Sequence, residues 1–329
     1  MVKGFATGIL SERSSMKAAL IDRYGGNEVV EVRDVPQPQP GPDDVLIRVY
    51  AAAINPLDWK IRNGMVKIFT GHTFPKILGS ECAGEVVATG SSVQGFAQGD
   101  RVIGFPGIKR LAAFAEYVCA PERTTFPKPV NVTFAQAATI PIAGITALQA
   151  LRDRGRLAAG QHVLINGASG GVGTFAVQIA KVFAAKVTAV CSGANSELVK
   201  GLGADRVIDH TREEFTKGSE RYDLIFDAVA KASFAACKRV LAPKGIYVTT
   251  LPTFAVLLNR YLTGYLTSQK ARIVMDRPNA RDMEWMKGRI EAGRIRIVID
   301  REYPLEQIRE ALAYSEAGKA KGKVVVRIF

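Results

Sequence analysis

The sequence has few of the residues that bind metals or form cross-links. Its 329 residues include only 4 cysteines and 3 histidines. The cysteines lie far apart, without the paired spacing of a disulfide framework or a zinc knuckle, at Cys82, Cys119, Cys191 and Cys237. The histidines are scattered away from the cysteines, so the two residue types form no tetrahedral ligand pattern. These shortages predict a metal-free protein of a reducing compartment, with the cytoplasm as the first expectation.

Long apolar runs are also missing. The longest candidate, residues 254–265, is interrupted by Asn259 and Arg260 and is too short for a membrane-spanning helix. Residues 1–15 contain basic and hydroxyl side chains but lack the apolar core of a secretory signal. We expect this segment to be a disordered extension. A mitochondrial leader is the weaker alternative to a cytoplasmic protein.

Basic residues outnumber acidic ones, but they form no separate arm. Lys and Arg total 44 against 31 Asp and Glu, which gives a formal net charge of +13 spread along the chain. No segment interleaves basic and aromatic residues as an RNA-binding platform does. We therefore expect no dedicated nucleic-acid site. The charge is interpreted as a solvated surface that also favours anionic cofactors.

Two kinds of local pattern follow one another along the chain, which is too long for one ordinary core. Short strands separated by glycine and proline predict a mostly β domain from residues 1–131, joined by residues 295–329 at the other end of the chain. Strands and helices alternate over residues 132–294, which predicts a doubly wound parallel sheet. The predicted fold class is therefore α/β with two domains.

A stretch of small residues is expected to connect the two domains. Residues 134–151 have helical spacing, and we expect a break in this helix near Pro141 and Gly144. At the far end, residues 322–328 form a last strand that should return to the first domain.

A dinucleotide-binding turn is predicted at residues 167–173. A short apolar run at residues 163–165 has the length and branching of a buried parallel strand, and a helix begins just after the turn. Small residues let the backbone approach a pyrophosphate, and the helix N-terminus offers free N–H groups. Tight packing of glycines is the structural alternative. The predicted cofactor contacts here are Ser169, Gly170, Gly171, Val172 and Gly173.

The end of the next strand indicates which dinucleotide is bound. NAD-selective sites place an acid there for the ribose 2′-hydroxyl, but this chain has no acid before Glu197. A carboxylate would repel a 2′-phosphate, whereas hydroxyl, amide and N–H groups would accept one. We therefore predict NADPH, held by Ser192, Gly193 and Asn195. A helix N-cap is the alternative role for the Ser and Asn side chains, and both roles can coexist.

The countercharge for the 2′-phosphate is not evident beside that strand. Lys200, Lys319 and Lys321 are candidates by position in the chain only. His210 follows a further short strand and is predicted to approach the adenosine end of the cofactor. A plain surface histidine is the alternative.

Several motifs follow one another in order from Met16 onward. They are N-P-x-D at residues 55–58, G-x-E-x-A-G-x-V at 79–86, G-D-R-V at 99–102, A-E-Y-V at 115–118, the glycine turn, L-G-A-D-x-V-I-D at 202–209 and G-K-x-V-V at 322–326. In these the sequence resembles the medium-chain dehydrogenase/reductase superfamily, and within it the zinc-free quinone oxidoreductase-like branch. The resemblance implies a GroES-like β domain formed by both chain ends, beside an inserted Rossmann domain. Relatives are often dimers, which would allow a homodimer here.

The positions of the zinc ligands differ from those of zinc-dependent relatives. Such relatives carry a cysteine near Asn55, a histidine at the position of Ser80 and another cysteine near residues 141–144. This chain has none of the three, and the four-cysteine lobe expected after residues 99–102 is missing as well. The resemblance therefore implies no metal.

Without a metal, catalysis must depend on hydride geometry and hydrogen-bond donors. The resemblance places Asn55 and Lys60 near the nicotinamide, where relatives often have tyrosine in place of the lysine. A lysine there could stabilise enolate-like charge or donate a proton. Alternatively, Lys60 pairs with Asp58 and only orders the loop. Asp58 is included among the catalytic candidates, although a structural role is preferred.

The resemblance completes the nicotinamide site with Thr146, Thr250 and Leu251. The leading hypothesis is an NADPH-dependent oxidoreductase that transfers hydride to a quinone or an α,β-unsaturated carbonyl. One alternative is a trans-acting enoyl reductase of a biosynthetic pathway, with a cleft under residues 254–266. Another is an NADPH-binding regulatory or nucleic-acid-contacting module with little turnover.

Overall fold

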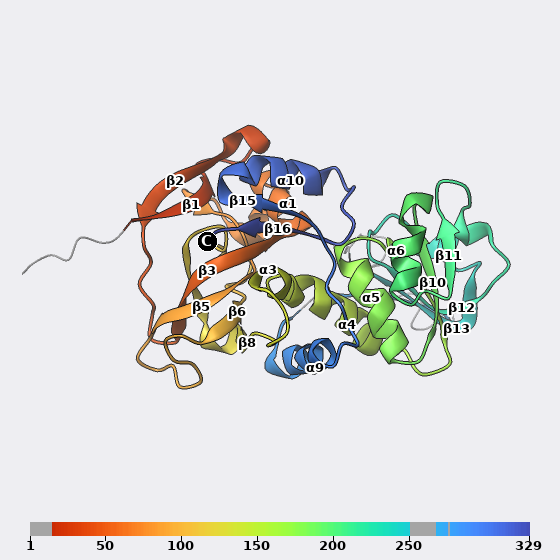
Figure 1. The fold of residues 1–329 in the computed structure, drawn as a ribbon. Helices are drawn as coiled ribbons and strands as arrows, with labels where there is room; N and C mark the ends of the chain where they lie inside the picture. The colour runs from red at the N-terminus through yellow and green to blue at the C-terminus, as the bar shows by residue number, and fades with distance from the viewer. Residues whose placement is uncertain (1–14, 251–267, 276) are drawn as a thin grey trace, which may run out of the picture.

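The protein consists of two lobes that lie side by side (Figure 1). The structure, a computed structural model, describes residues 15–250, 268–275 and 277–329. One lobe, red to yellow with blue elements, is mostly β; the other, green to cyan, has a sheet with helices packed on it. The C-terminus lies in the β lobe, so a C-terminal segment completes a unit that begins near the N-terminus.

The β lobe is built from two sheets. A three-stranded antiparallel sheet has the order β2-β1-β4, with β1 at Ser15–Ile21, β2 at Val30–Pro36 and β4 at Lys76–Ile77. A second sheet has the order β15-β16-β3-β5-β6-β8, from β15 (Ile299–Pro304), β16 (Lys323–Arg327), β3 (Asp44–Ile54), β5 (Cys82–Thr89), β6 (Arg101–Gly104) and β8 (Thr125–Pro127). The last strand, β16, pairs antiparallel with β3, and Val324 faces Ile54. The apolar sides of these strands form the core of the lobe.

One predicted strand of this lobe is shifted. The expected strand at residues 114–118 is wrong, because β7 runs from Tyr117 to Pro121 and pairs with β3. The preceding residues bond to β1 instead: Ala19 N–H donates to the Phe114 carbonyl, and Glu116 N–H donates to that of Lys17. The apolar run is therefore divided between two sheets, which its alternation alone does not reveal.

The second lobe contains a six-stranded parallel sheet. Its order is β11-β10-β9-β12-β13-β14, with bounds Arg206–Asp209, Lys186–Cys191, His162–Asn166, Tyr222–Asp227, Leu241–Thr249 and Lys270–Ile273. The strand order reverses direction between β9 and β12, which is the switch point where such sheets bind ligands. The predicted doubly wound parallel sheet is confirmed.

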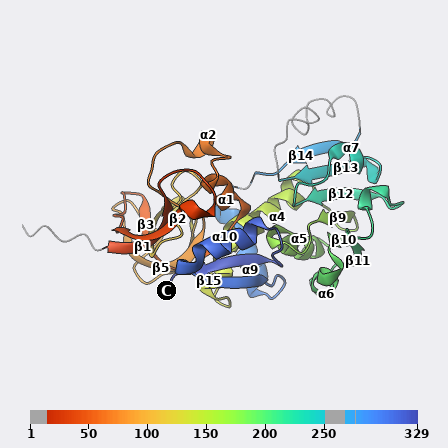
Figure 2. The same ribbon diagram turned by 90° about the horizontal axis from the view of Figure 1, so that it is seen from above.

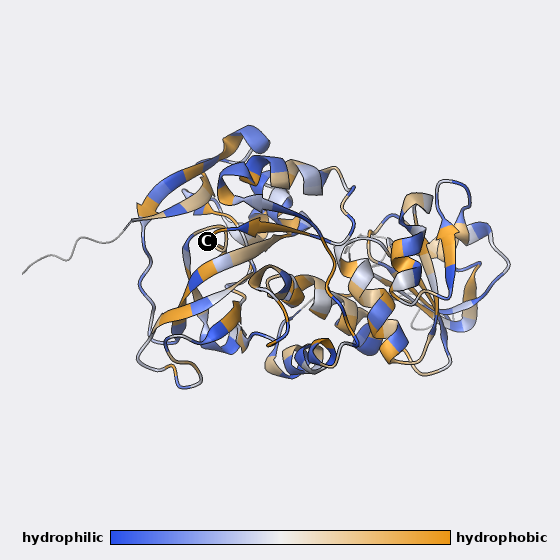
Figure 3. Ribbon diagram, viewed as in Figure 1, coloured by the Kyte–Doolittle hydropathy of each residue, from blue (hydrophilic) through white to orange (hydrophobic). Residues whose placement is uncertain are grey.

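The two faces of this sheet are buried by different elements. Val163 and Ile165 of β9 pack into the core that contains α5 (Gly171–Val182) and α9 (Ala280–Glu291), while Leu164 packs on the opposite face with Phe234 of α7 (Phe234–Cys237). Both faces are therefore apolar, as expected of a parallel strand that reads as a continuous apolar run. Figure 2 shows α5 lying along the sheet, and Figure 3 shows the apolar residues concentrated on the strands and inner helix faces.

The helix between the lobes does not break at Pro141 or Gly144, so that expectation is wrong. It continues from α3 (Phe134–Ala137) through a π-helical segment at Ile140–Gly144 into α4 (Ile145–Gln149) and a second π segment at Ala150–Arg154. Pro141 sits in the first turn of the π segment, where a missing N–H costs little.

This same helix, residues 134–154, is long and apolar enough to cross a membrane by length and composition alone. However, 78% of its most apolar window is buried inside the protein, which identifies it as a core helix. No other helix in the described parts of the chain meets that test. The apolar candidate at residues 254–265 lies outside the described residues.

The remaining helices complete both lobes. They are α1 (Pro56–Arg62), α2 (Lys67–Thr70), α6 (Ser196–Gly201) and α10 (Ile308–Glu316). The predicted domain boundaries fall in connections between elements, after β8 and after α9. They stay a prediction, as does disorder of residues 1–15, of which all but the last lie outside the described residues.

Candidate active site

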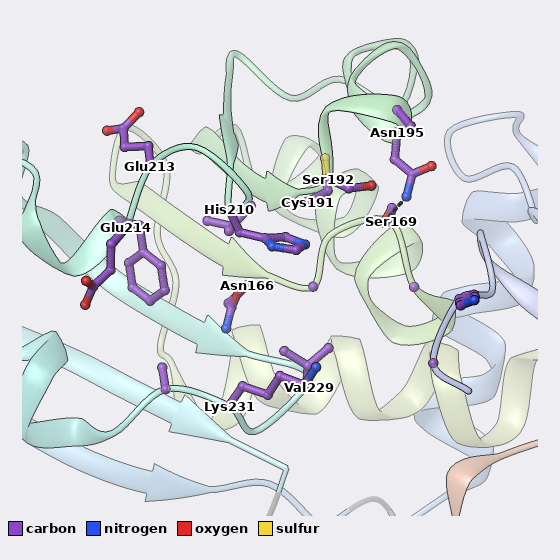
Figure 4. A pocket seen from close by; sticks show the side chains of 18 of the residues that line it. Asn166, Ser169, Cys191, Ser192, Asn195, His210, Glu213, Glu214, Val229 and Lys231 are labelled. Carbon is purple, nitrogen blue, oxygen red and sulfur yellow. Dashed lines mark hydrogen bonds between the residues drawn. The ribbon is translucent and has the colours of Figure 1, made fainter. Parts of the chain in front are cut away.

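A cleft lies at the carboxyl edge of the parallel sheet, at the switch point between β9 and β12 (Figure 4). Its cavity of about 790 Å³ is in the size range of cofactor sites. The lining comes from the ends of β9 and β10 and from four loops, at residues 167–170, 192–195, 210–216 and 229–236, together with residues 318–321. The cleft is thus formed mainly by the α/β lobe, with one wall from the connection before β16.

Two glycines of the predicted turn are required by geometry. Gly167 has a φ of +80°, a left-handed conformation that favours glycine. A Cβ on Gly173 would lie 2.1 Å from the Gly167 carbonyl oxygen, so only glycine lets α5 pack against the turn. Ser169 and Gly170 line the cleft, whereas Gly171, Val172 and Gly173 form the first turn of α5 behind it.

The loop after β10 is joined to the glycine turn. Asn195 Nδ2 donates to Ser169 Oγ at 3.1 Å, the contact dashed in Figure 4, and Ser192 lines the cleft beside them. Asn195 Oδ1 is buried and, among the described residues, has no hydrogen-bond partner. Because a hydroxyl both donates and accepts, the reversed amide would bond Ser169 equally well and offer Nδ2 to a ligand. Either way, one polar atom of Asn195 has no partner among the described residues.

Gly193, a predicted cofactor contact, lies against Asp209. It does not line the cleft; a Cβ on it would lie 2.5 Å from Asp209 Oδ2. The Thr211 hydroxyl and backbone N–H, together with the Gly193 N–H, lower the pKa of Asp209. Asp209, at the end of β11, therefore accepts hydrogen bonds from its own turn and from the loop after β10. Sequence reasoning missed it, since it is distant from Gly193 along the chain.

Three lysines, one histidine and two glutamates are among the residues that line the cleft. The glutamates, Glu213 and Glu214, pair with Arg206 at 3.7 Å and with Lys217 at 2.7 Å. Lys319, Lys321 and His210 line the cleft as predicted candidates, and Lys231 joins them without having been predicted. No salt bridge involves Lys231, Lys319 or Lys321 within the described part of the chain. Lys200 lies elsewhere and pairs with Glu197 at 3.0 Å, so it is not a candidate for this site.

At the switch point, a buried carboxylate joins neighbouring strands and the loop after β12 through hydrogen bonds. Asp227, at the end of β12, accepts hydrogen bonds from Asn166 Nδ2 (2.9 Å), the Tyr247 hydroxyl (3.0 Å) and the Ala232 N–H (2.8 Å). Burial and the nearby Asp227 charge raise the pKa of Tyr247, so the phenol stays a neutral donor. These bonds fix residues 228–232, which carry Lys231 along one wall of the cleft.

The predicted catalytic residues form a second group, near the start of α1. Asn55 caps this helix, and its N–H donates to Asp58 Oδ2 at 2.7 Å. Asp58 is fully buried, and its Oδ1 lacks a hydrogen bond among the described residues. Burial raises the pKa of Asp58 to about 7, and the Glu81 charge adds to the rise. The Ser80 hydroxyl lies close enough to oppose that shift, although its geometry falls short of a hydrogen bond.

The side-chain amide of Asn55 is already fully engaged. Its Oδ1 accepts from Lys323 Nζ at 2.7 Å, and its Nδ2 donates to Glu81 Oε1 at 2.8 Å. A lysine only donates and a carboxylate only accepts, so the amide orientation is determined. Glu81 and Lys323 were missed as site residues, although the G-x-E and G-K motifs contain them.

Lys60 lies apart from this group. The alternative in which it pairs with Asp58 is wrong, because Asp58 is buried and bonds the Asn55 N–H. Lys60 is half-buried, with its Nζ 5.4 Å from the centre of the Trp59 ring, and this burial lowers its pKa. Neither Asn55, Asp58 nor Lys60 lines the cofactor cleft.

The remaining predicted contacts are placed as follows. Thr146 is buried in α4 and does not line the cleft, and Thr250 Oγ1 donates to the Ala228 carbonyl at 3.5 Å. Leu251 lies outside the described residues. Over the described positions, no three His, Cys, Asp or Glu side chains are grouped to hold a metal ion.

Comparisons with known proteins identify the family of this chain. Residues 41–130 match the family model of the alcohol dehydrogenase GroES-like domain, and residues 202–326 match that of the zinc-binding dehydrogenases. The chain is 35% identical over 323 residues to the chloroplast envelope quinone oxidoreductase homolog of Arabidopsis thaliana, covering 94% of this chain and 98% of that one. It is also 35% identical to the chloroplastic NADPH-dependent alkenal/one oxidoreductase of the same plant, over 94% of this chain and 79% of the relative.

A solved structure extends the likeness to the fold. The quinone oxidoreductase from Coxiella burnetii superposes with a TM-score of 0.90 at 32% identity, covering 96% of this chain and 100% of that one. The chain therefore belongs to the medium-chain dehydrogenase/reductase superfamily, as a nicotinamide-dependent oxidoreductase related to the quinone oxidoreductases.

Proposed function

We propose that this protein is a zinc-independent reductase that uses NADPH to reduce a quinone or an α,β-unsaturated carbonyl. The observation that carries the proposal is the charge of the cofactor cleft. Lys231, Lys319 and Lys321 line it without salt bridges among the described residues, and the end of β10 has no carboxylate. The two acids of the lining, Glu213 and Glu214, are each paired with a basic side chain, so the three lysines leave an excess of positive charge. Such a site suits the extra phosphate that distinguishes NADPH from NADH.

The cleft fits a dinucleotide in shape as well as charge. It lies at the switch point, the glycine turn leaves room for backbone approach, and Asn195 keeps one buried polar atom free. When bound, the cofactor supplies the hydride. Ser169 and Asn195 would hold the phosphates from two loops that are already hydrogen-bonded to each other, which lowers the cost of ordering them.

Asp209 does not argue for NADH. Its carboxylate accepts from the Thr211 N–H at 3.0 Å and the Thr211 hydroxyl at 2.8 Å. It lies against Gly193, and neither residue is among those that line the cleft. A ribose-binding acid needs free acceptor oxygens directed at the ligand. Ser192 and Asn195 instead present neutral polar groups to the cleft, and Lys319 and Lys321 add positive charge.

Zinc independence is supported by the donor set. Asn55 and Ser80 offer an amide and a hydroxyl, which are poor zinc ligands, and no cysteine lies in residues 141–144. Glu81 is a usual ligand type, but its Oε1 already accepts from Lys323 and its Oε2 from the Ile142 N–H at 2.7 Å. The Lys323 ammonium therefore occupies the position at which a metal ion would have to bind Glu81.

Lys60 is our candidate for stabilising or protonating the substrate oxygen. Its half-buried position lowers its pKa, which brings an ammonium closer to the range of a useful proton donor. Asp58 serves the helix cap, and Asn55 serves the buried network, so both act on position and not on the substrate directly.

Cofactor binding and turnover test the proposal together. Titration of the protein with NADPH and NADH, followed by fluorescence, should give tighter binding of NADPH. Turnover should then occur with simple quinones and enones. Preference for a carrier-bound enoyl substrate would favour the biosynthetic alternative, and NADPH binding with no turnover would favour a regulatory module. Failure to bind NADPH would overturn the proposal.

We also propose that the protein works in a reducing compartment. All four cysteines are free, and three of them are buried in the lobes. Burial raises the pKa of the Cys82 thiol to about 12, so it resists oxidation.

We further propose a homodimer, as expected from the family resemblance. Light scattering on the purified protein tests it.

A further inference from the structure

We propose that Lys323 is a positioning residue that ties the glycine turn of the α/β lobe to the Asn55–Glu81 pair of the β lobe. It would thereby hold the glycine turn and the predicted catalytic loop at residues 55–60 at a fixed separation. This inference rests on the proposed reductase function, because its catalytic consequence is the geometry of hydride transfer.

The backbone beside Lys323 contacts the glycine turn directly. The Gly322 N–H donates to the Ser169 carbonyl at 2.8 Å, and Gly322 forms an isolated parallel bridge with Gly170. Gly322 has a φ of +92°, which lets the chain leave this contact and enter β16 at the next residue. The first residue of β16 is therefore fixed against the turn that would hold the pyrophosphate.

The aliphatic part of the Lys323 side chain then crosses the start of α5. A Cβ on Gly171 would lie 2.8 Å from Lys323 Cδ, so the lysine fills the space that this glycine leaves. Gly171 is the first residue of α5. The side chain thus passes directly over the N-terminus of the cofactor helix on its way to the β lobe.

The ammonium group ends in a closed set of acceptors. Nζ donates to the Ile54 carbonyl at 3.1 Å, to Asn55 Oδ1 at 2.7 Å and to Glu81 Oε1 at 3.0 Å. A lysine has three donors, and all three are used here. Lys323 is 3% exposed, so it offers no hydrogen to a substrate and acts only through its neighbours.

Glu81 carries the connection to a third element. Its Oε2 accepts from the Ile142 N–H at 2.7 Å, and Ile142 belongs to the π segment of the helix between the lobes. Glycine turn, α1 cap and interlobe helix therefore meet in one hydrogen-bonded network around Lys323 and Glu81. None of these contacts requires a bound ligand.

The energetics favour a geometric role over a simple gain in stability. A buried ion pair loses much of its attraction to desolvation, and apolar pairs of similar size often stabilise a fold as well or better. What the pair does supply is a set of short, directional bonds between segments far apart in sequence. Hydride transfer is sensitive to such distances, since a displacement of about 1 Å can cost roughly 100-fold in rate.

The test uses a variant that removes both charges together. Lys323→Met alone would leave Glu81 buried without its cation and could unfold the protein. Lys323→Met combined with Glu81→Gln removes the pair, while the Gln oxygen can still accept from the Ile142 N–H. Without Lys323 the Asn55 amide is free to turn over, so that its Oδ1 accepts from the Gln NH2 group. Arg327→Met is the matched control, because Arg327 lies on the same strand but is exposed and pairs with Glu302 only at 3.6 Å.

The first readout is kinetic. The double variant should lose about tenfold or more in kcat, while the Kd for NADPH stays within about threefold. The deuterium isotope effect with NADPD should rise as hydride transfer becomes rate-limiting. Arg327→Met should match the wild type in all three. A folded double variant with kcat within about twofold of the wild type would overturn the proposal.

The second readout does not depend on activity. In the absence of cofactor, amide hydrogen exchange at residues 167–174 should become about tenfold faster in the double variant and stay unchanged in Arg327→Met. Unchanged exchange in the double variant would contradict the tie even if the wild type proved inactive. Conversely, a wild-type protein that neither binds NADPH nor reduces any substrate would refute the proposed function. The hydrogen-exchange comparison would still decide whether Lys323 ties the two segments together.

Discussion

Lys323 Nζ lies 3.0 Å from Glu81 Oε1, and the two side chains are 4% and 0% exposed. The residues are 242 positions apart in the chain. Their contact brings the start of the last strand to the loop before β5, and the same lysine packs over Gly171 of the cofactor helix. One side chain thus contacts both the cofactor turn and the predicted catalytic loop.

Removing the two lysines on the connection before β16 should weaken NADPH binding selectively. Lys319→Met combined with Lys321→Met takes two positive charges from the cleft wall. We expect the Kd for NADPH to rise by about tenfold and that for NADH by less than about threefold, because only NADPH carries the extra phosphate. Titration at two salt concentrations measures both constants. Lys200→Met is the control, since Lys200 pairs with Glu197 outside the cleft; an equal loss for both cofactors would contradict the assignment.

Lys60 should control the pH dependence of turnover. Burial lowers its pKa, so a protonated Lys60 is present at low pH and is lost as the pH rises through a value below that of a free lysine. We expect kcat for an enone to fall along an alkaline limb that Lys60→Met removes, with kcat lowered by about tenfold at neutral pH. Lys67→Met, on the exposed helix α2, should keep the wild-type profile. An unchanged profile in Lys60→Met would reduce Lys60 to a loop residue.

Asp58 should make the stability of the fold depend on pH. Its pKa is about 7 in the folded protein, against an ordinary value of 3.8. A raised folded pKa means that the folded state binds the proton more tightly, so the stability contribution is complete below about pH 4 and is lost as the pH rises to about 7. Chemical denaturation across this window should show the decline in the wild type.

Asp58→Asn is the matched variant for this effect. The Asn oxygen can still accept from the Asn55 N–H, so the helix cap is retained while the titration is removed. We expect the decline between pH 4 and 7 to become shallower in the variant. A variant whose denaturation midpoints follow the wild-type curve at every pH would assign the dependence to other groups.

Gly173 and Gly288 form a pair of alanine substitutions with opposite expected outcomes. A Cβ on Gly173 would lie 2.1 Å from the Gly167 carbonyl oxygen, so Gly173→Ala should destabilise the fold by several kcal/mol, roughly 3 or more, and disrupt the cofactor turn. Nothing lies within 4 Å of a Cβ on Gly288, which is inside α9. Gly288→Ala should stabilise by about 0.5–1 kcal/mol. Thermal unfolding with and without NADPH measures both; equal stability of the two variants would be inconsistent with the close turn.

Local patterns in the sequence determined most of the α/β lobe. Strand, glycine turn and helix could be predicted because each depends on neighbours within about four residues. The glycine turn and the Ser192–Asn195 loop both reach the predicted cleft, since parallel strands bring their carboxyl ends to one edge. The patterns gave wrong predictions at two places. The apolar run that begins at Phe114 is divided between two sheets, and the helix continues past Pro141 as a π-helical segment.

The hydrogen bonds of the group around Asn55 could not be predicted from local patterns in the sequence. The sequence placed Asn55 near the nicotinamide through its resemblance to a family, but it did not indicate that the Asn55 amide is fully bonded to Lys323 and Glu81. It likewise gave no sign that Asp209 lies against Gly193 or that Lys231 enters the cleft. Hydrogen bonds and charges act over a few ångströms in space, and only the folded chain decides which distant residues come that close. The sequence by itself determined the cofactor turn and the family; the tertiary structure decided which charges surround the turn and which residue ties it to the other lobe.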